Sequence, residues 1–268
     1  MVAPPYPRLR AGAVLSALFF SAPASGSEAP ASDLADTLEY WLGPAQHEPV
    51  VWRVGARLEY SRYDIGGGIE AEGWQNFYAL SGKRGGWTAG AGVSYQSFRV
   101  PDFLGGRRTL SGAGDTTLFL RYDIDRVLPL KDWYLSAAVR VKAPTASTRE
   151  GLGTGAFDEA LSFDALKVIG DWAVFAYGGY TLRGGANSGR DTWNGAIGAD
   201  YKAGPRWNTG LSYEWRERPF SKPVSSFYGY GRYRLTDSVS LTGYGIVGIT
   251  GRRPDLSIGL QVAWFGLW

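Results

Sequence analysis

The sequence has 268 residues, of which 44% are hydrophobic and 15% aromatic, with 38 glycines, 11 tryptophans, 16 tyrosines and no cysteine. A soluble domain of this size usually shows longer apolar helices and fewer Trp and Tyr, whereas this composition suits a membrane β-barrel. The lack of cysteine excludes disulfides and thiolate metal sites, and a net charge of +3 is too small to indicate a nucleic-acid partner.

The N-terminus has the three parts of a secretory signal peptide. Residues 1–10 carry Arg8 and Arg10 and no acidic residue, residues 11–20 form an apolar run, and small residues follow. This run is too short to cross about 30 Å of hydrocarbon as a helix, which favours an export signal over a membrane anchor. We predict a signal peptide over residues 1–26, cleaved after Ala24 or Gly26.

Residues 27–48 do not share the pattern of the rest of the chain. Apolar residues between Leu34 and Leu42 would lie on one face of a short helix. The segment is expected to be a periplasmic leader or a small plug in the barrel mouth, and a disordered leader is the alternative. It also holds His47, the one histidine of the sequence.

From about residue 50 onward, apolar and polar residues alternate with a period of two, which is the period of a β-strand with two different faces. In the first such stretch, one face holds Val50, Trp52, Val54, Ala56, Leu58 and Tyr60, and the other holds Val51, Arg53, Gly55, Arg57, Glu59 and Ser61. Aromatic residues often bound the apolar rows, as Trp193 and Tyr201 do. Because such rings favour the headgroup level of a membrane, the rows indicate two girdles around a hydrocarbon band rather than a soluble sandwich.

The alternating segments predict about twelve strands, at 49–64, 73–82, 87–99, 114–124, 132–143, 156–167, 171–183, 191–202, 206–217, 225–235, 238–249 and 256–268. Mostly long connections, such as 65–72 and 100–113, alternate with mostly short ones. This is the layout of outer-membrane barrels, with long external loops, short periplasmic turns and both chain ends periplasmic. We therefore predict an all-β fold, a single antiparallel transmembrane β-barrel over residues 49–268, located in the bacterial outer membrane and surrounded by its lipid.

The last predicted strand, 256–268, alternates regularly and ends on an aromatic residue, Trp268. It resembles the C-terminal recognition strand of outer-membrane proteins. The barrel-assembly machinery reads that strand, so this machinery is an expected partner.

Several short motifs follow one another in the middle of the chain: Gly112-Ala113-Gly114-Asp115-Thr116-Thr117-Leu118, Arg121-Tyr122, Val141-Lys142-Ala143-Pro144-Thr145, Gly151-Leu152-Gly153-Thr154-Gly155, Asp158, Gly170-Asp171-Trp172 and Gly178-Gly179-Tyr180. In their order and spacing, residues 112–201 resemble a family of outer-membrane transporters named after the MetA pathway of phenol degradation. The resemblance covers about a third of the chain. It implies a barrel that conducts small hydrophobic or aromatic compounds.

The face predicted to line the lumen carries nearly balanced charges, eight positive and seven negative, together with aromatic residues. The charges either form salt bridges that fill a narrow barrel or line a small water-filled pore. A barrel of twelve strands is intermediate in width between barrels filled by side chains and barrels with an open channel. The candidate pore-lining residues are Asp115, Phe119, Arg121, Tyr134, Arg140, Lys142, Asp158 and Tyr177. Among them, Arg121, Arg140 and Lys142 would form a basic patch that favours aromatic acids.

The favoured function is a channel for passive passage of small hydrophobic or aromatic compounds, with no cofactor. A structural or surface-binding barrel with a filled lumen is the first alternative, and an outer-membrane hydrolase is the second. Catalysis is disfavoured because the only histidine lies in the leader and no cluster has metal-ligand spacing. The chain also shows no nucleotide motif that would drive active transport.

Overall fold

A computed structural model describes residues 50–66, 69–101, 106–124, 130–150, 152–185, 189–219, 222–250 and 256–267. The predicted signal peptide, the leader and His47 lie outside this part of the chain. The strands are β1 (Val51–Gly66), β2 (Ile69–Arg84), β3 (Trp87–Pro101), β4 (Arg107–Ala113), β5 (Thr116–Asp123), β6 (Trp133–Ala143), β7 (Asp158–Ile169), β8 (Trp172–Arg183), β9 (Thr192–Lys202), β10 (Trp207–Arg216), β11 (Val224–Arg234), β12 (Val239–Thr250) and β13 (Leu256–Leu267). Among the described residues, we find no helix of the length and hydrophobicity that crossing a membrane requires.

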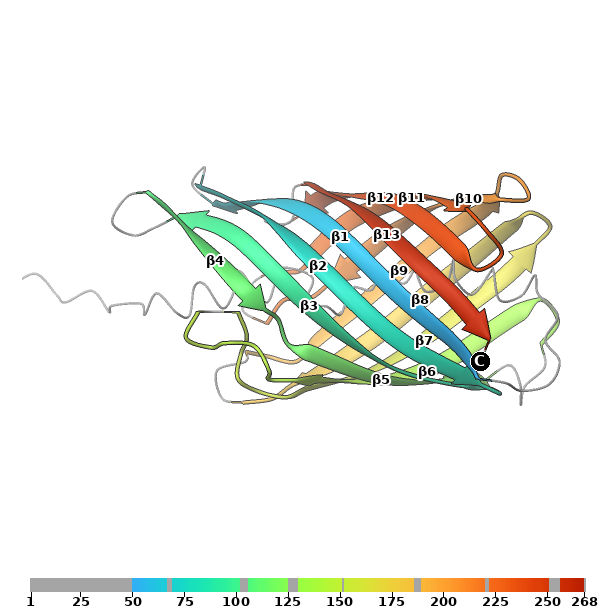
Figure 1. Cartoon of the computed structure of the whole chain (residues 1–268), viewed down its shortest axis with the longest axis horizontal. Coiled ribbons are helices and arrows are strands. Elements are labelled where there is room, and N and C mark those ends of the chain that lie inside the picture. Colours follow the sequence, from blue (N-terminus) through green and yellow to red (C-terminus); the bar gives the residue numbers. More distant parts are fainter. Residues whose placement is uncertain are drawn as a thin grey trace, which may run out of the picture.

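The strands form one closed antiparallel barrel (Figure 1). Strand β1 pairs with β2 on one side and with β13 on the other, which closes the sheet. Strand β3 pairs with β5 along residues 87–92 and with β4 along residues 95–101, so β4 and β5 occupy one strand position that is interrupted between them. The barrel therefore has twelve strand positions, which confirms the predicted all-β class and strand number.

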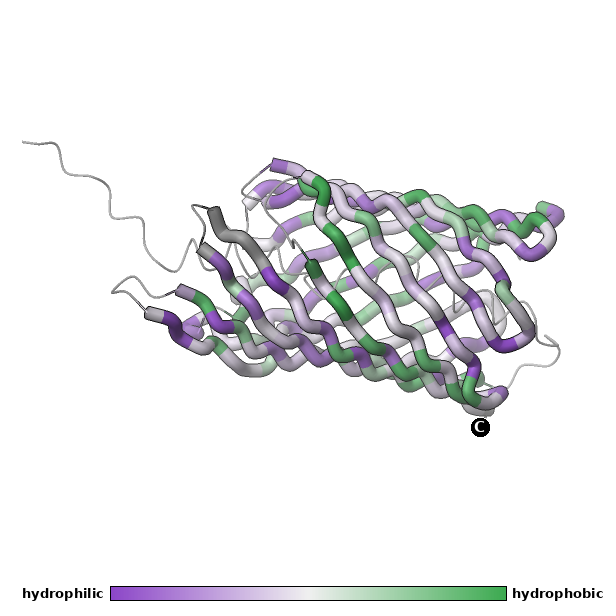
Figure 2. Tube along the Cα trace, turned by 90° about the horizontal axis from the view of Figure 1, so that it is seen from above, coloured by the Kyte–Doolittle hydropathy of each residue, from purple (hydrophilic) through white to green (hydrophobic). Residues whose placement is uncertain are grey.

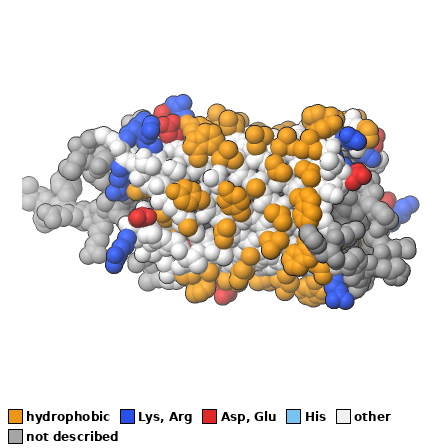
Figure 3. All heavy atoms as spheres, viewed as in Figure 1, with side chains coloured by type: hydrophobic (Ala, Val, Ile, Leu, Met, Phe, Trp, Pro, Cys, Tyr) orange, Lys and Arg blue, Asp and Glu red, His pale blue; other side chains and the backbone are white. Residues whose placement is uncertain are grey.

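The two faces of the sheet have opposite character, and hydropathy alternates along each strand (Figure 2). Apolar side chains point outward, as with Ile197 and Leu211, which are 62% and 58% exposed. The polar residues Asp200 and Ser212, on the other face of the same strands, are each only 1% exposed. Figure 3 shows the outward apolar side chains in a broad band around the middle of the barrel.

Paired aromatic rings bound this band at both ends. Toward the short turns the neighbouring-strand pairs are Trp87–Tyr122, Trp172–Tyr201 and Trp207–Tyr233, and toward the other end they are Tyr60–Trp74, Tyr180–Trp193 and Tyr213–Phe227. On β8, Trp172 and Tyr180 are separated by about 26 Å along the strand, and a tilt of about 40° makes this comparable to the apolar height of outer-membrane barrels. The closed sheet, the apolar band and the two girdles make this a transmembrane barrel of the outer-membrane type.

The first strands in the sequence extend further than predicted, at the end of the barrel opposite the chain termini. Residues 65–72 and 100–113 were expected to be loops, but β1 and β2 extend into the first range and β4 lies in the second. Both expectations were wrong because these segments carry charged residues on their outward face. A stretch without an apolar face does not show the alternation from which the strands were predicted. Beyond the girdle a strand no longer faces hydrocarbon, so its outward face need not be apolar.

The assignment of the faces predicts an asymmetric response to added charge. Ile197 lies on β9 midway between the girdle residues Trp193 and Tyr201. Ile197→Arg should destabilise the barrel by about 2–4 kcal/mol because it places a cation at the bilayer midplane. The matched control is Ser162→Arg on the lumen face of β7, where Asp164 is close along the same face. Urea titration of barrels folded into vesicles measures both, and equal losses would mean that the faces are reversed.

Candidate functional site

An aromatic cluster lines the inside of the barrel on the side of β6–β12. Its members are Leu166, Ala173, Phe175, Tyr228, Tyr230, Tyr244 and Ile246, with Tyr134 and Val168 packed against them. These residues belong to β6, β7 and β8 on one flank and to β11 and β12 on the other. The two flanks meet across β9 and β10, where the inward positions include Gly198 and Gly210.

Inward glycines leave space in which the aromatic rings of neighbouring strands pack against the barrel wall. Gly198 pairs directly with Phe175, Gly210 with Tyr230, Gly259 with Tyr244 and Gly90 with Phe119. In each pair, a Cβ atom added to the glycine would come within 2.3–2.5 Å of the ring. The rings therefore lie over the glycines and along the wall, and a larger residue opposite would push each ring toward the barrel axis.

Hydrogen bonds fix the hydroxyl ends of two of these rings. Tyr230 Oη donates to Asp200 Oδ1 at 2.7 Å, and Tyr244 Oη donates to Glu59 Oε2 at 2.7 Å. Tyr228 stacks on Tyr244 with ring centroids 5.4 Å apart. Because charge-assisted hydrogen bonds are stronger than neutral ones, the carboxylates anchor the rings in one orientation. The rings themselves are buried, since Tyr228, Tyr230 and Tyr244 are only 2%, 5% and 8% exposed, so they pack against one another inside the barrel.

The glycine–ring contacts yield a test of packing in the wall. Gly210→Ala should destabilise the barrel by about 1–3 kcal/mol, because the added methyl overlaps the Tyr230 ring. Gly231→Ala is the control, since a Cβ atom there meets nothing within 4 Å. Urea midpoints of the two variants in detergent give the comparison. If Gly210→Ala is as stable as Gly231→Ala, the ring does not lie where we place it.

At the interruption between β4 and β5, the chain makes room for a loop that folds into the barrel. Gly114 N donates to Ser94 O at 2.8 Å, which preserves one ladder bond, and a Cβ on Gly114 would come within 2.2 Å of Ser94 Oγ. Residues 144–157 connect β6 to β7 and are described except for residue 151; we call them the inward loop. Thr145 Oγ1 accepts from Thr116 N at 2.8 Å, and so the loop satisfies a backbone donor beside the interruption.

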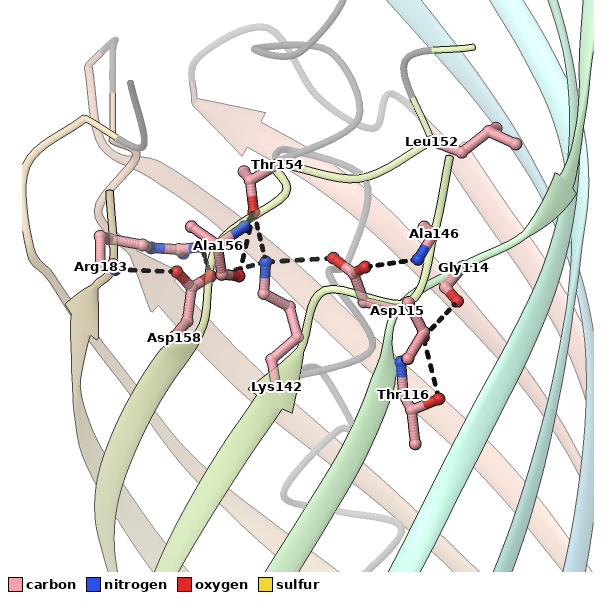
Figure 4. Close-up of polar contacts among 12 residues, drawn as sticks. Gly114, Asp115, Thr116, Lys142, Ala146, Leu152, Thr154, Ala156, Asp158 and Arg183 are labelled. Atoms are coloured by element: carbon pink, nitrogen blue, oxygen red, sulfur yellow. Dashed lines mark hydrogen bonds and ion pairs between the residues drawn. The ribbon is translucent and has the colours of Figure 1, made fainter. Parts of the chain in front are cut away.

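Four alternating charges hold the inward loop in place (Figure 4). Lys142 Nζ lies 3.1 Å from Asp115 Oδ2 and 3.0 Å from Asp158 Oδ2, and Arg183 Nη1 lies 3.0 Å from the same Asp158 oxygen. We call Asp115, Lys142, Asp158 and Arg183 the charge chain. Its contacts to the loop are the donation from Ala146 N to Asp115 Oδ1 at 3.0 Å and from Lys142 Nζ to Thr154 Oγ1 at 2.8 Å.

The middle of the inward loop packs on the neighbouring inner wall, formed by β2–β4. Leu152 is only 4% exposed and belongs to a cluster with Ala71, Phe98, Val100, Leu110 and Ala146. Its carbonyl accepts a hydrogen bond of 3.1 Å from Gln96 Nε2, an inward residue of β3. A Cβ on Gly112 would come within 2.5 Å of Leu152 Cδ1, so Gly112 leaves the space that Leu152 fills. The loop consequently lies across the inner face of β2–β5.

The eight predicted pore-lining residues all lie on inward rows, and they fall into three groups. Asp115, Lys142 and Asp158 meet in the charge chain. Arg121 lies 3.8 Å from Asp123, and Arg140 lies beside Phe119 on the neighbouring strand. The aromatic members line the wall: Phe119 over Gly90, Tyr134 against the aromatic cluster, and Tyr177 accepting from Asn194 Nδ2 at 2.9 Å. The predicted basic patch is thus partly neutralised, because Lys142 lies between two carboxylates.

Four residues of the site, Gln96, Leu152, Thr154 and Arg183, were not among the predicted pore-lining residues. All four act through contacts with the inward loop or the charge chain. One usable signal was present in the sequence, because the motifs at 112–118 and 141–145, the motif that holds Leu152 and Thr154, and Asp158 meet here.

Breaking the charge chain should release the inward loop. Lys142→Met keeps the length of the side chain but removes its contacts to both carboxylates and to Thr154. Amide hydrogen exchange in residues 144–157 should become at least about tenfold faster, because a hydrogen bond to a charged group is worth about 1.5–3 kcal/mol. Lys167→Met is the control, since Lys167 lies over the Trp133 ring on the outer face. Unchanged exchange in Lys142→Met would contradict the role of the charge chain.

Comparison with known proteins supports the fold. No protein-family model matches the sequence, and no curated protein matches it either. Among solved structures, an outer-membrane channel from Pseudomonas putida F1 aligns with a TM-score of 0.64 at 16% identity, covering 84% of this chain and 100% of that one. The β domain of the Bordetella autotransporter Brka gives 0.53 at 15% identity, covering 80% and 99%. The KdgM porin gives 0.52 at 13% identity, covering 79% and 98%. The chain therefore has the fold of outer-membrane barrels.

Proposed function

We propose that the barrel is a passive outer-membrane channel for small hydrophobic or aromatic compounds. The observation that carries this proposal is the barrel interior, where aromatic rings pack over glycines and hydrogen bonds to carboxylates fix two of the tyrosine hydroxyls. Small-molecule sites combine an apolar lining with a few oriented polar groups in the same way. Wall contacts of this kind favour a flat apolar solute over a sugar of similar size.

The inward loop and the charge chain would control the entrance. Their contacts link inward side chains of β3, β6 and β7 to the loop near one end of the barrel, the end opposite the short turns. Because Lys142 is shared by two carboxylates, the local charges at this point nearly cancel. A solute would pass between the loop and the aromatic wall, so selection would rest on shape and apolar contact more than on charge.

The resemblance of residues 112–201 to the phenol-degradation transporters agrees with this solute class. The similarity in fold to a channel from Pseudomonas putida F1 and to a porin is consistent with passage through the barrel. The role is transport and not catalysis. Delivery to the outer membrane through recognition of residues 256–268 by the assembly machinery is part of the proposal.

A structural barrel with a filled lumen is the second candidate. It is favoured by the deep burial of inward polar side chains, of which Arg232 is only 1% exposed. Such side chains can brace a narrow barrel in place of a pore. This candidate predicts no solute flux at all.

Uptake by intact cells separates the two candidates. Cells lacking general porins would express the barrel, and entry of a radiolabelled phenol would be compared with entry of a pentose of similar size. We expect faster phenol entry with the barrel than without it, and little gain for the pentose. No gain for either solute would leave the filled barrel as the better account, and equal gains would refute the aromatic selectivity.

A further inference from the structure

Strands β1–β4 carry a charged cluster on the outward face just beyond the aromatic girdle. Arg62 is two residues past Tyr60 on β1, and Glu72 is two residues before Trp74 on β2, where Tyr60 and Trp74 form a girdle pair. Two residues along a strand correspond to about 6.6 Å. The cluster therefore lies at the depth where lipid headgroups meet the barrel, at the end opposite the chain termini.

The cluster is built as an alternating row across neighbouring strands. In the sheet register Arg62 lies opposite Glu72, and Glu72 lies opposite Arg99. Arg107 Nη1 approaches Glu72 Oε1 at 3.4 Å, Arg99 Nη1 approaches the same oxygen at 3.9 Å, and Arg62 pairs with Glu70. We call these three arginines and two glutamates the arginine patch, which carries one net positive charge.

The arginines keep unused donors directed at their surroundings. The side chains of Arg62, Arg99 and Arg107 are 52%, 60% and 49% exposed. A guanidinium has five N–H donors, and a carboxylate engages two of them at most in a forked pair. The glutamates thus position the guanidinium groups and leave N–H groups free to bind a further anion.

The patch is confined to one side of the barrel. Figure 3 shows charged side chains gathered outside the apolar band at the end where β1–β4 project. On β7 and directly after β10, the charged residues at the same rim are the acidic Glu159 and Glu217. Other exposed cations at this end, Arg149, Arg190 and Lys222, lie in loops, whereas the arginine patch lies on paired strands beside the girdle.

We propose that the arginine patch binds the phosphate groups of lipopolysaccharide in the outer leaflet. Guanidinium groups match phosphate oxygens in bidentate geometry, and the position beside the girdle brings a lipid phosphate into reach while its acyl chains cover the apolar band below. The inference rests on the outer-membrane location and is independent of what passes through the lumen.

Titration with defined lipids tests the inference on the full-length barrel in detergent. Native mass spectrometry would follow binding of diphosphorylated lipid A, of the same lipid with its phosphates removed, and of lipid A with inorganic phosphate as competitor. The test variant is Arg62→Gln with Arg99→Gln and Arg107→Gln. The matched control replaces three exposed cations at the opposite rim, Lys131, Lys202 and Arg206, with glutamine.

We expect the patch variant to bind diphosphorylated lipid A about tenfold or more weakly, as expected for several lost arginine contacts to an anionic membrane surface. The control should change less than about twofold, and millimolar inorganic phosphate should compete only in part because it lacks acyl chains. Equal losses in both variants, or equal binding of the dephosphorylated lipid to the unaltered barrel, would overturn the inference. If the triple variant fails to fold, Arg99→Gln alone is compared with Arg206→Gln by the same criteria.

Discussion

The structure depends on one constraint, which is that backbone N–H and C=O groups inside a membrane must bond to each other. A sheet meets this requirement only when its two edges join. Here the edges are β1 and β13, which pair in continuous register from Val51 to Arg62. In the closed sheet, alternate side chains face the lipid or the lumen. The packing of side chains on these two sides determines the other features of the barrel.

On the inner side, the same requirement explains how the barrel tolerates a broken strand. The interruption at Gly114 and Asp115 removes ladder pairs, but Ser94 O and Thr145 Oγ1 take over as acceptors for the amides of Gly114 and Thr116. The inward loop is thus part of the bonding of the wall as well as a layer against the inner face of β2–β5. Asp115, freed from the strand, becomes the first member of the charge chain.

Period-two alternation was sufficient to predict the barrel, the faces and the girdles, because burial in lipid imposes this pattern on every strand. It failed for residues 107–113, where β4 lies outside the hydrocarbon and carries Arg107 on its outward face. The charge chain could not be predicted from the sequence for another reason. Asp115, Lys142 and Asp158 were placed on inward rows, but Arg183 was not, and which carboxylate meets Lys142 depends on register between strands and on the path of the inward loop. The pairing of inward glycines with aromatic residues on neighbouring strands could be identified only from the register between strands.

We propose that the lumen is a passage whose entrance is narrowed by the inward loop. Single-channel recording in planar bilayers tests it most directly, with the full-length barrel and the Lys142→Met variant measured in the same salt. We expect small discrete openings for the unaltered barrel and a larger conductance when the charge chain is broken. Absence of any conductance in both proteins would contradict it and identify the barrel as filled.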